Sequence, residues 1–272
     1  MSSSISVAVL GASGRMGQAL LRCLPEFPRL ELKSAVCAPG DGLAGRDAGE
    51  AAGLPEIGVP LDERIDNALA GVRVAIDFTL GEAVPGNADA CRRAGVGLVC
   101  GVTGVDAAAD EALRRAAREV PVLWAPNMSA GVAVLERIAA LAAAALEDFD
   151  AGVQDVHHAA KRDAPSGTAL ALGRAIALAR GQDAAAAEPD AELHAAALQY
   201  AALRLGDVVG EHSVLLAGRG ERLALSHVAT DRAVFARGAL RAAVWLAGRP
   251  AGMYTLGEVL GLGRVDTLAG GQ

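Results

Sequence analysis

One short segment, residues 157–168, gathers the side chains that could do chemistry. It reads His-His-Ala-Ala-Lys-Arg-Asp-Ala-Pro-Ser-Gly-Thr and holds two of the five histidines of the chain beside Lys161. Imidazole groups titrate near neutral pH, and an ammonium group is a compact positive charge. Together they could bind a small polyanion and donate a proton to it.

The end of this segment predicts an anion site at a helix start. An apolar helix pattern follows at residues 169–179, and a strand pattern, 151–156, precedes the segment. The first N–H groups of a helix have no partner inside it, and the helix dipole favours negative charge there. Gly167 would let an anion approach the backbone, and Ser166 and Thr168 could add hydroxyl donors.

A purely structural interpretation of the same residues is available. Pro-Ser-Gly-Thr is an ordinary helix start with a hydroxyl N-cap. Two histidines near a strand end are often a surface pair, and Lys161 with Asp163 could be a solvated ion pair of little energetic value. The concentration of these residue types in one segment favours an active site.

A glycine-rich turn near the start of the chain predicts a second site. The buried-strand pattern Ile5–Leu10 runs into Gly11-Ala12-Ser13-Gly14-Arg15-Met16-Gly17, and a helix pattern, 18–24, and a strand pattern, 30–36, follow. This order is the context that a dinucleotide fingerprint requires, because the glycines allow close approach and the helix start faces the pyrophosphate. The spacing is G-x-x-G-x-x-G, and a tight turn without a ligand is the alternative.

The residues after the second strand bear on the choice of cofactor. An acidic residue there would bind the adenosine ribose and favour NAD. The chain instead reads Cys-Ala-Pro-Gly at 37–40, with no acid before Asp41, and Arg15 or Arg46 could contact a phosphate. The pattern mildly favours NADPH and leaves NADH open.

Alternating strand and helix patterns continue to residue 128. Residues 41–70, rich in Gly, Pro and Asp, are expected to form a loop with a short helix. Strands are expected at 72–77, 97–100 and 122–125, and helices at 88–94 and 107–118. This alternation predicts an α/β fold with a Rossmann-like doubly wound parallel sheet. Ligands of such sheets bind at the carboxyl ends of the strands. The turns at Thr79, 101–103 and 125–128 follow those ends and outline a cofactor cleft.

The pattern changes after a long helix expected at 131–146. Strands near 152–156, 211–216 and 222–226 surround the helix at 169–179, which predicts an α+β substrate domain with a mixed sheet. We therefore expect a dinucleotide-binding domain at 1–128, joined by the C-terminal residues 238–272. Residues 129–237 would form a substrate-binding and oligomerisation domain.

Composition narrows the classes of function. Hydrophobic residues make up 52% of the chain and aromatic residues only 3%, so the core must be built from Ala, Val and Leu. A net charge of −7 without a basic cluster argues against nucleic-acid binding. No apolar run predicts a membrane span, and the N-terminus predicts no signal peptide. The four cysteines form no C-x-x-C, so we expect a reducing cytoplasm and no metal site.

Several stretches resemble a known family. The His-His-x-x-Lys-x-Asp-Ala-Pro-Ser-Gly-Thr-Ala run is similar to that of dihydrodipicolinate reductases, also called 4-hydroxy-tetrahydrodipicolinate reductases. The match continues in the glycine turn, Phe78-Thr79, 101–104, 125–129, 206–212 and 232–252, so it spans nearly the whole chain in order. The chain departs from the pattern of this family in two places. The stretch at 184–205 is shorter and richer in alanine than in the family, and the acid near Cys37 is missing.

The resemblance implies a reaction of lysine and diaminopimelate biosynthesis. NADPH or NADH would reduce a cyclic unsaturated dicarboxylate to tetrahydrodipicolinate, with a homotetramer as the assembly. By position, His157 and Lys161 would be the catalytic acids and His158, Ser166, Gly167 and Thr168 the substrate contacts. The cofactor positions would be Gly11, Ala12, Ser13, Gly14, Arg15, Met16, Gly101, Val102, Thr103, Ala125, Pro126, Asn127 and Met128. A related NAD(P)-dependent dehydrogenase for another small amino or carboxylic acid, and a catalytically silent dinucleotide sensor, are the alternatives.

Overall fold

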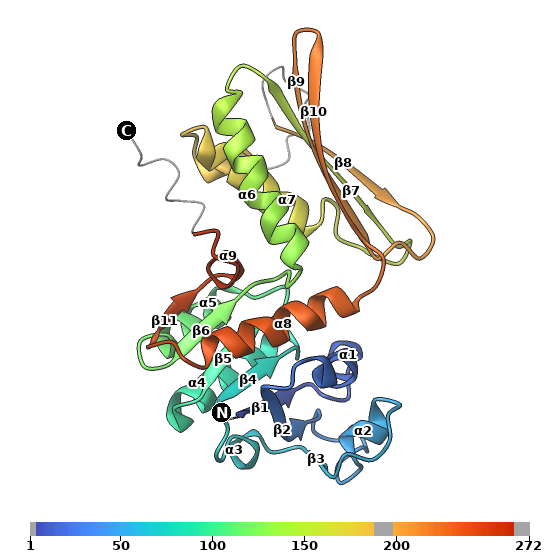
Figure 1. Cartoon of the computed structure of the whole chain (residues 1–272), viewed down its shortest axis with the longest axis vertical. Helices are drawn as coiled ribbons and strands as arrows, with labels where there is room; N and C mark the ends of the chain where they lie inside the picture. Colours follow the sequence, from blue (N-terminus) through green and yellow to red (C-terminus); the bar gives the residue numbers. More distant parts are fainter. Residues whose placement is uncertain (1–3, 188–197, 264–272) are drawn as a thin grey trace. The chain divides into compact units, whose positions relative to one another are not determined.

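The computed structural model describes residues 4–187 and 198–263 and divides into two compact units (Figure 1). Unit 1 contains the described residues of Met1–Ser129 and Arg232–Val259, and unit 2 those of Ala130–Asp231 and Leu260–Gln272. None of the helices in these described residues is long and apolar enough to cross a membrane.

Unit 1 is built on a seven-stranded sheet in the order β11-β6-β5-β4-β1-β2-β3, and all its strand pairings are parallel. Its strands are β1 (Ile5–Leu10), β2 (Leu30–Val36), β3 (Leu61–Asp62), β4 (Val74–Asp77), β5 (Gly97–Cys100), β6 (Pro121–Trp124) and β11 (Gly252–Tyr254). The helices are α1 (Arg15–Cys23), α2 (Ala48–Ala51), α3 (Ile65–Ala68), α4 (Val84–Ala94), α5 (Ala107–Ala116), α8 (Ala233–Leu246) and α9 (Leu256–Val259), with short 3₁₀ turns η1 (Leu24–Glu26) and η2 (Gly81–Ala83).

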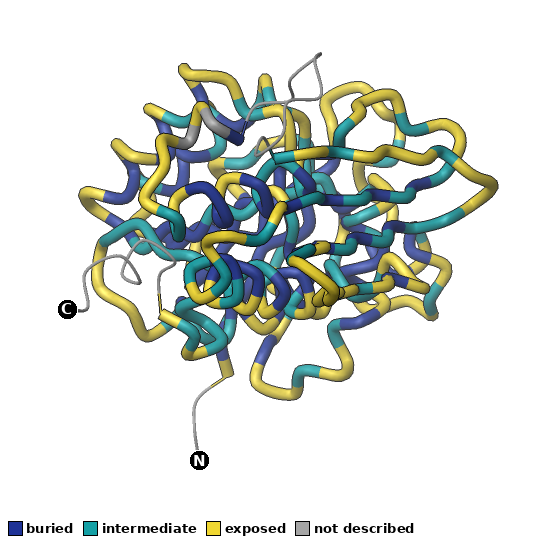
Figure 2. The backbone as a smooth tube through the Cα atoms, turned by 90° about the horizontal axis from the view of Figure 1, so that it is seen from above, coloured by how far each residue is buried: buried dark blue, intermediate teal, exposed yellow. Residues whose placement is uncertain are grey.

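Helices cover both faces of this sheet. Alternate strand residues, among them Ala8, Leu10 and Leu98, pack in one core with residues of α4 and α5. The intervening strand residues point to the other face, because side chains alternate along a strand. There α8 packs against α1 and against β4, β5 and β6. The residues of the central strands are buried, and Figure 2 colours buried segments of the backbone dark blue. The predicted Rossmann-like doubly wound parallel sheet is confirmed.

Some features of unit 1 were not predicted from the sequence. Residues 41–70 were expected to form a loop with one short helix, but they contain α2, β3 and α3. Within the C-terminal residues expected to join the first domain, β11 pairs with β6 and α9 contacts α8, whereas residues 260–263 are grouped with unit 2. Strand β11 has only three residues, too few to show a periodic pattern.

Unit 2 is a four-stranded mixed sheet with two helices on one face. The order is β10-β9-β7-β8, in which β7 pairs parallel with β8 and antiparallel with β9. The strands are β7 (Asp150–His157), β8 (Gln199–Arg204), β9 (Gly210–Gly218) and β10 (Glu221–Ala229), and the helices are α6 (Ala130–Ala145) and α7 (Gly167–Ala179), with η3 (Ala184–Ala187). Residues of α6, α7, β7 and β9 share one core. The predicted mixed sheet is confirmed.

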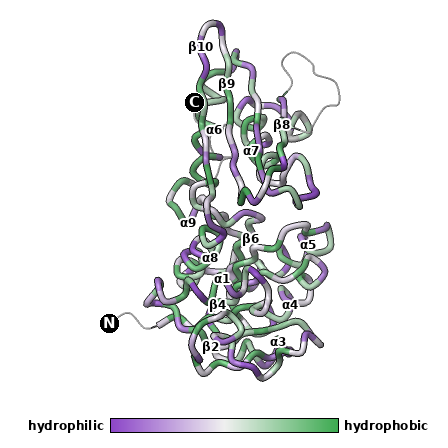
Figure 3. The backbone as a smooth tube through the Cα atoms, turned by 90° about the vertical axis from the view of Figure 1, so that its right-hand side faces the viewer, coloured by the Kyte–Doolittle hydropathy of each residue, from purple (hydrophilic) through white to green (hydrophobic). Residues whose placement is uncertain are grey.

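The other face of this sheet carries no helix in the described part of unit 2. Exposed apolar side chains on it include Leu203, Leu215 and Val228, which are 43%, 42% and 56% exposed. Hydrophilic and hydrophobic stretches both occur along β9 and β10 (Figure 3), and burial alternates along β9, as expected for a strand whose two faces meet different surroundings. Strand β8 was not predicted, because its apolar residues do not alternate with polar ones.

Candidate active site

The carboxyl ends of adjacent parallel strands bring the predicted cofactor residues of unit 1 to one edge of the sheet. Strands β6, β5, β4, β1 and β2 are neighbours in that order. Each turn is tied to the next strand by a backbone hydrogen bond: Gly11 N to Val36 O at 2.9 Å, Phe78 N to Leu10 O at 3.2 Å, Gly101 N to Asp77 O at 2.9 Å, and Ala125 N to Cys100 O at 3.1 Å. The glycine turn, 101–103 and 125–128 therefore lie in one row.

The glycine turn fits the phosphates of a dinucleotide. A Cβ atom at Gly17 would lie 2.2 Å from the Gly11 carbonyl oxygen, so this helix can pack on the turn only with glycine there. Gly11 has a φ of 79°, a conformation that favours glycine. The N-cap of α1 is Gly14, and no side chain caps the helix start. The backbone N–H groups of this helix start are thus not covered by a capping side chain.

A buried carboxyl group orders the turn after β4. Asp77 is fully buried, and its Oδ1 accepts hydrogen bonds from the Thr79 backbone N–H at 2.8 Å and from the Thr79 hydroxyl at 2.7 Å. Its Oδ2 accepts one from the Asn87 amide at 2.9 Å. Burial raises the pKa of Asp77, while the hydrogen bonds oppose that shift. This residue holds the Phe78-Thr79 turn against the Gly11 turn.

The residues after β2 place one acid near the glycine turn. Burial raises the pKa of the Cys37 thiol to about 11, so this position carries no charge at neutral pH. The exposed Asp41 carboxylate accepts a hydrogen bond from Leu43 N–H at 2.8 Å. This bond and a second from the Ser13 hydroxyl lower the pKa of Asp41. A negative charge thus lies beside the turn, although no acid stands at the end of the strand.

In unit 2, the segment after β7 holds the predicted catalytic residues. His157 is the last residue of β7 and is buried, whereas Lys161 is partly exposed. Lys161 Nζ pairs with Asp163 Oδ2 at 2.8 Å. Its position is set by a turn in which Lys161 N–H donates to the His158 carbonyl at 3.0 Å. His158 itself is half-buried.

The predicted anion site at the start of α7 is open. Ser166 is the N-cap, and its Oγ accepts a hydrogen bond from Ala169 N–H at 3.2 Å. Gly167 is exposed, and a Cβ atom added there would meet nothing within 4 Å. Thr168 follows in the first turn and is half-buried. At this helix start the Cβ position of Gly167 faces open space, so an anion could approach the backbone there.

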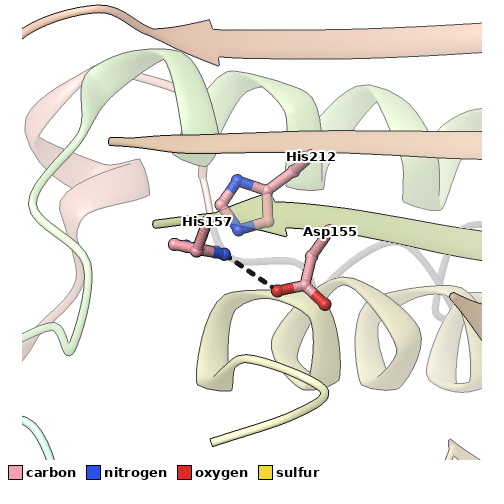
Figure 4. Close-up of side chains that lie close together, drawn as sticks. All are labelled: Asp155, His157 and His212. Carbon is pink, nitrogen blue, oxygen red and sulfur yellow. Dashed lines mark hydrogen bonds and ion pairs between the residues drawn. The ribbon is translucent and has the colours of Figure 1, made fainter. Parts of the chain in front are cut away.

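Three residues absent from the sequence-based site surround His157. The side chain of Asp155 is fully buried, and its Oδ2 lies 2.9 Å from His157 Nδ1 (Figure 4). The same oxygen lies 3.2 Å from Arg204 Nη1. The ring of His212 meets the ring of His157 edge-on, with centroids 5.1 Å apart. Burial is the main cause that lowers the pKa of His212 to about 4, with the nearby His157 adding to it.

These side chains could also be considered as metal ligands. Asp155, His157 and His212 each offer a donor atom, and the three atoms lie within 4.8 Å of one another. However, Asp155 Oδ2 is already shared by an imidazole nitrogen and by the guanidinium of Arg204. Both of these contacts would have to be rearranged before that oxygen could bind a metal ion. The arrangement is better suited to holding an imidazole and moving a proton.

One of these missed residues had a signal in the sequence. Asp155 is two residues before His157 in a predicted strand, so the two side chains share a face. His212 ends the 206–212 stretch of the family resemblance, but nothing in the sequence placed it or Arg204 beside His157, because both reach the site through strand pairing. Arg204 on β8 is opposite His157 in the register, and His212 on β9 is opposite Asp155.

Comparisons with known proteins identify the family of this chain. A family model described as "Dihydrodipicolinate reductase, N-terminus" matches residues 5–128, and one described as "Dihydrodipicolinate reductase, C-terminus" matches residues 131–260. A curated 4-hydroxy-tetrahydrodipicolinate reductase of Thiobacillus denitrificans is 45% identical over 266 residues, covering 95% of this chain and 99% of the relative. That of Alkalilimnicola ehrlichii is 44% identical over 263 residues, with 94% and 98% coverage.

A solved structure shows the same fold. The dipicolinate-bound dihydrodipicolinate reductase from Paenisporosarcina sp. TG-14 has a TM-score of 0.75 at 23% identity, covering 93% of this chain and 97% of that one. The family predicted from the motifs is therefore confirmed by relatives that match both units. The chain belongs to the dihydrodipicolinate reductase family of NAD(P)H-dependent oxidoreductases.

Proposed function

We propose that this protein is a 4-hydroxy-tetrahydrodipicolinate reductase of lysine and diaminopimelate biosynthesis. It would reduce a cyclic unsaturated dicarboxylate to tetrahydrodipicolinate with NADPH or NADH. The observation that carries the proposal is the buried Asp155–His157 pair on the segment that also presents Lys161 and the open start of α7. This segment combines an acid, a fixed cation and an anion-binding helix start.

Unit 1 would hold the dinucleotide at the row of turns along the sheet edge. The backbone of 11–16 would bind the pyrophosphate, because the helix start of α1 is uncapped and the glycines allow close approach. The turns at 101–103 and 125–128 would line the rest of the cleft. When bound, the reduced nicotinamide supplies the hydride.

Unit 2 would bind the substrate and supply the proton. A carboxylate of the substrate would accept hydrogen bonds from Ser166, Gly167 and Thr168 at the start of α7, with His158 as a further contact. Hydride addition to the conjugated ring builds negative charge that an acid must neutralise. His157 would donate that proton, and Lys161 would stabilise the anion as a second acid.

The preference between NADPH and NADH depends on the surroundings of Asp41. The absence of an acid at Cys37 mildly favours NADPH, since nothing at that position repels a 2′-phosphate. The carboxylate of Asp41 beside Ser13 acts in the opposite direction, because it would repel a phosphate and accept hydrogen bonds from ribose hydroxyls. We propose that both cofactors are used.

The assembly would be a homotetramer formed through the sheet of unit 2. Its helix-free face exposes the apolar side chains of Leu203, Leu215 and Val228. Apolar side chains exposed on a sheet face without helices support a contact between copies of the chain through this face. The cytoplasmic location and the absence of nucleic-acid and membrane partners stay predictions from the sequence.

Cofactor oxidation with freshly generated substrate tests the proposed function. The purified protein is assayed with NADPH and with NADH side by side, and the loss of the reduced-nicotinamide absorbance is followed. Turnover that requires the lysine-pathway substrate supports the proposal. Turnover only with another small amino or carboxylic acid would indicate a related dehydrogenase, and cofactor binding without any turnover would indicate a sensor.

A further inference from the structure

We propose that Asp155 is a positioning residue that makes Nε2 of His157 the nitrogen that transfers the proton. The inference rests on the proposed function, in which His157 is the acid. It goes further by assigning the reactive atom and the group that selects it. Neither the sequence motif nor the family match assigns a role to Asp155.

The hydrogen bond between the two residues determines the tautomer. Asp155 Oδ2 lies 2.9 Å from His157 Nδ1, and the Asp155 side chain is fully buried (Figure 4). An ionised carboxylate can only accept hydrogen bonds, so Nδ1 must carry a proton for this bond to form. The charged imidazole then has its transferable proton on Nε2. After that proton leaves for the substrate, the ring is neutral with the Nδ1 proton retained.

Arg204 keeps the carboxylate ionised. Its Nη1 lies 3.2 Å from Asp155 Oδ2, and the Arg204 side chain is only 16% exposed. Burial alone would raise the pKa of Asp155, but its hydrogen bond to His157 and the charge of Arg204 lower it overall. A second guanidinium nitrogen of Arg204 donates to the Asp163 carbonyl, and Asp163 pairs with Lys161. Arg204 therefore links the supports of both proposed acids.

Gly210 lies beside Nε2 of His157. A Cβ atom added at Gly210 would lie 3.2 Å from His157 Nε2, so a side chain there would crowd the reactive nitrogen. Every strand of the unit 2 sheet contributes a charged or titratable group near the rings of His157 and His212. These groups are Asp155 on β7, Arg204 on β8, His212 itself on β9, His227 on β10, and Lys161 in the segment after β7. His212 is neutral at the working pH, so it adds no positive charge beside His157.

Substitution of Asp155 by asparagine gives the main test. Asparagine has nearly the same shape but no charge, so we expect kcat to fall about 100-fold while KM changes little. A general acid must be protonated, so activity falls as pH rises. Without the negative charge of Asp155, the pH dependence of kcat should differ from that of the wild-type protein. The D150N variant makes the same chemical change at the exposed start of β7 and should retain normal kcat.

A measurement on the unmodified protein keeps the inference testable if D155N does not fold. The nitrogen chemical shifts of the His157 imidazole should show the Nδ1–H tautomer at alkaline pH in the wild-type protein. A dominant Nε2–H tautomer would overturn the inference. So would a D155N variant with unchanged kcat and an unchanged pH profile.

The two failures can be told apart. If H157Q and K161M both keep full turnover, the proposed roles of those residues fail, and the inference fails with them. If H157Q is impaired while D155N behaves like D150N, only the role of Asp155 is wrong. Affinity for NADPH and NADH, measured by fluorescence without substrate, should be equal in all these variants, because the substitutions lie in unit 2.

Discussion

The low pKa of His212 makes the stability of the protein depend on pH in a defined window. The pKa falls from 6.5 to about 4 on folding, mainly because the side chain is buried. Between these values the unfolded chain binds a proton that folded His212 does not. Above pH 6.5 His212 is neutral in both states and does not reduce the free energy of unfolding. As pH falls from 6.5 toward 4, the free energy of unfolding decreases.

The magnitude follows from the size of this shift. A change of one pKa unit corresponds to about 1.4 kcal/mol, so the shift of His212 from 6.5 to about 4 corresponds to at most about 3 kcal/mol. His212 is only 3% exposed, so solvent screening reduces this value little. Such a loss is a large fraction of the stability of a typical domain.

The assay compares the wild-type protein with H212Q. Glutamine is neutral at every pH used, and its amide can still reach toward the Ser166 hydroxyl, which lies 3.4 Å from His212 Nε2. Urea unfolding is followed by circular dichroism at a fixed protein concentration, from mildly alkaline pH down to about pH 4. We expect the wild-type protein to lose at most about 3 kcal/mol more than H212Q over this range. Equal losses in the two proteins would refute the reasoning.

Four further expectations can be checked with simple assays. Replacing Lys161 by methionine should lower kcat about 100-fold, and a variant with full turnover would remove this residue from the list of acids. Replacing Asp41 by asparagine should raise affinity for NADPH several-fold relative to NADH, since a negative charge near the phosphate is lost; equal effects on both cofactors would argue against this role. An alanine Cβ atom at Gly238 would lie 1.7 Å from the Met128 carbonyl oxygen, so G238A should destabilise the protein by about 1–3 kcal/mol in urea unfolding. G248A is the matched control, because nothing lies within 4 Å of that position. Treatment with a chelator should leave kcat unchanged, and a loss restored by zinc would show that the Asp155 cluster holds a metal.

The sequence was sufficient for the local parts of the fold and site. Ile5–Leu10 followed by a glycine turn predicts a phosphate-binding strand–turn–helix, because the chemistry depends on adjacent residues. The segment 157–168 likewise carries its acid, cation and helix start in one short stretch. Strand bounds such as Leu30–Val36 agree with the apolar pattern.

Short or weakly patterned elements could not be predicted in the same way. β8 has no regular alternation, and β11 is too short to show one. Their pairing with longer strands makes them strands. Local propensity is weak, so tertiary contacts determine such elements.

The sequence by itself determined which side chains are available for proton transfer and anion binding, since these follow from residue type and near neighbours. Only the tertiary structure decided which groups control them. Arg204 and His212 lie on strands far along the chain from His157, and the register of β8 and β9 against β7 brings them to the imidazole. The physical reason is that burial and the electric field around a titratable group arise from contacts between distant residues.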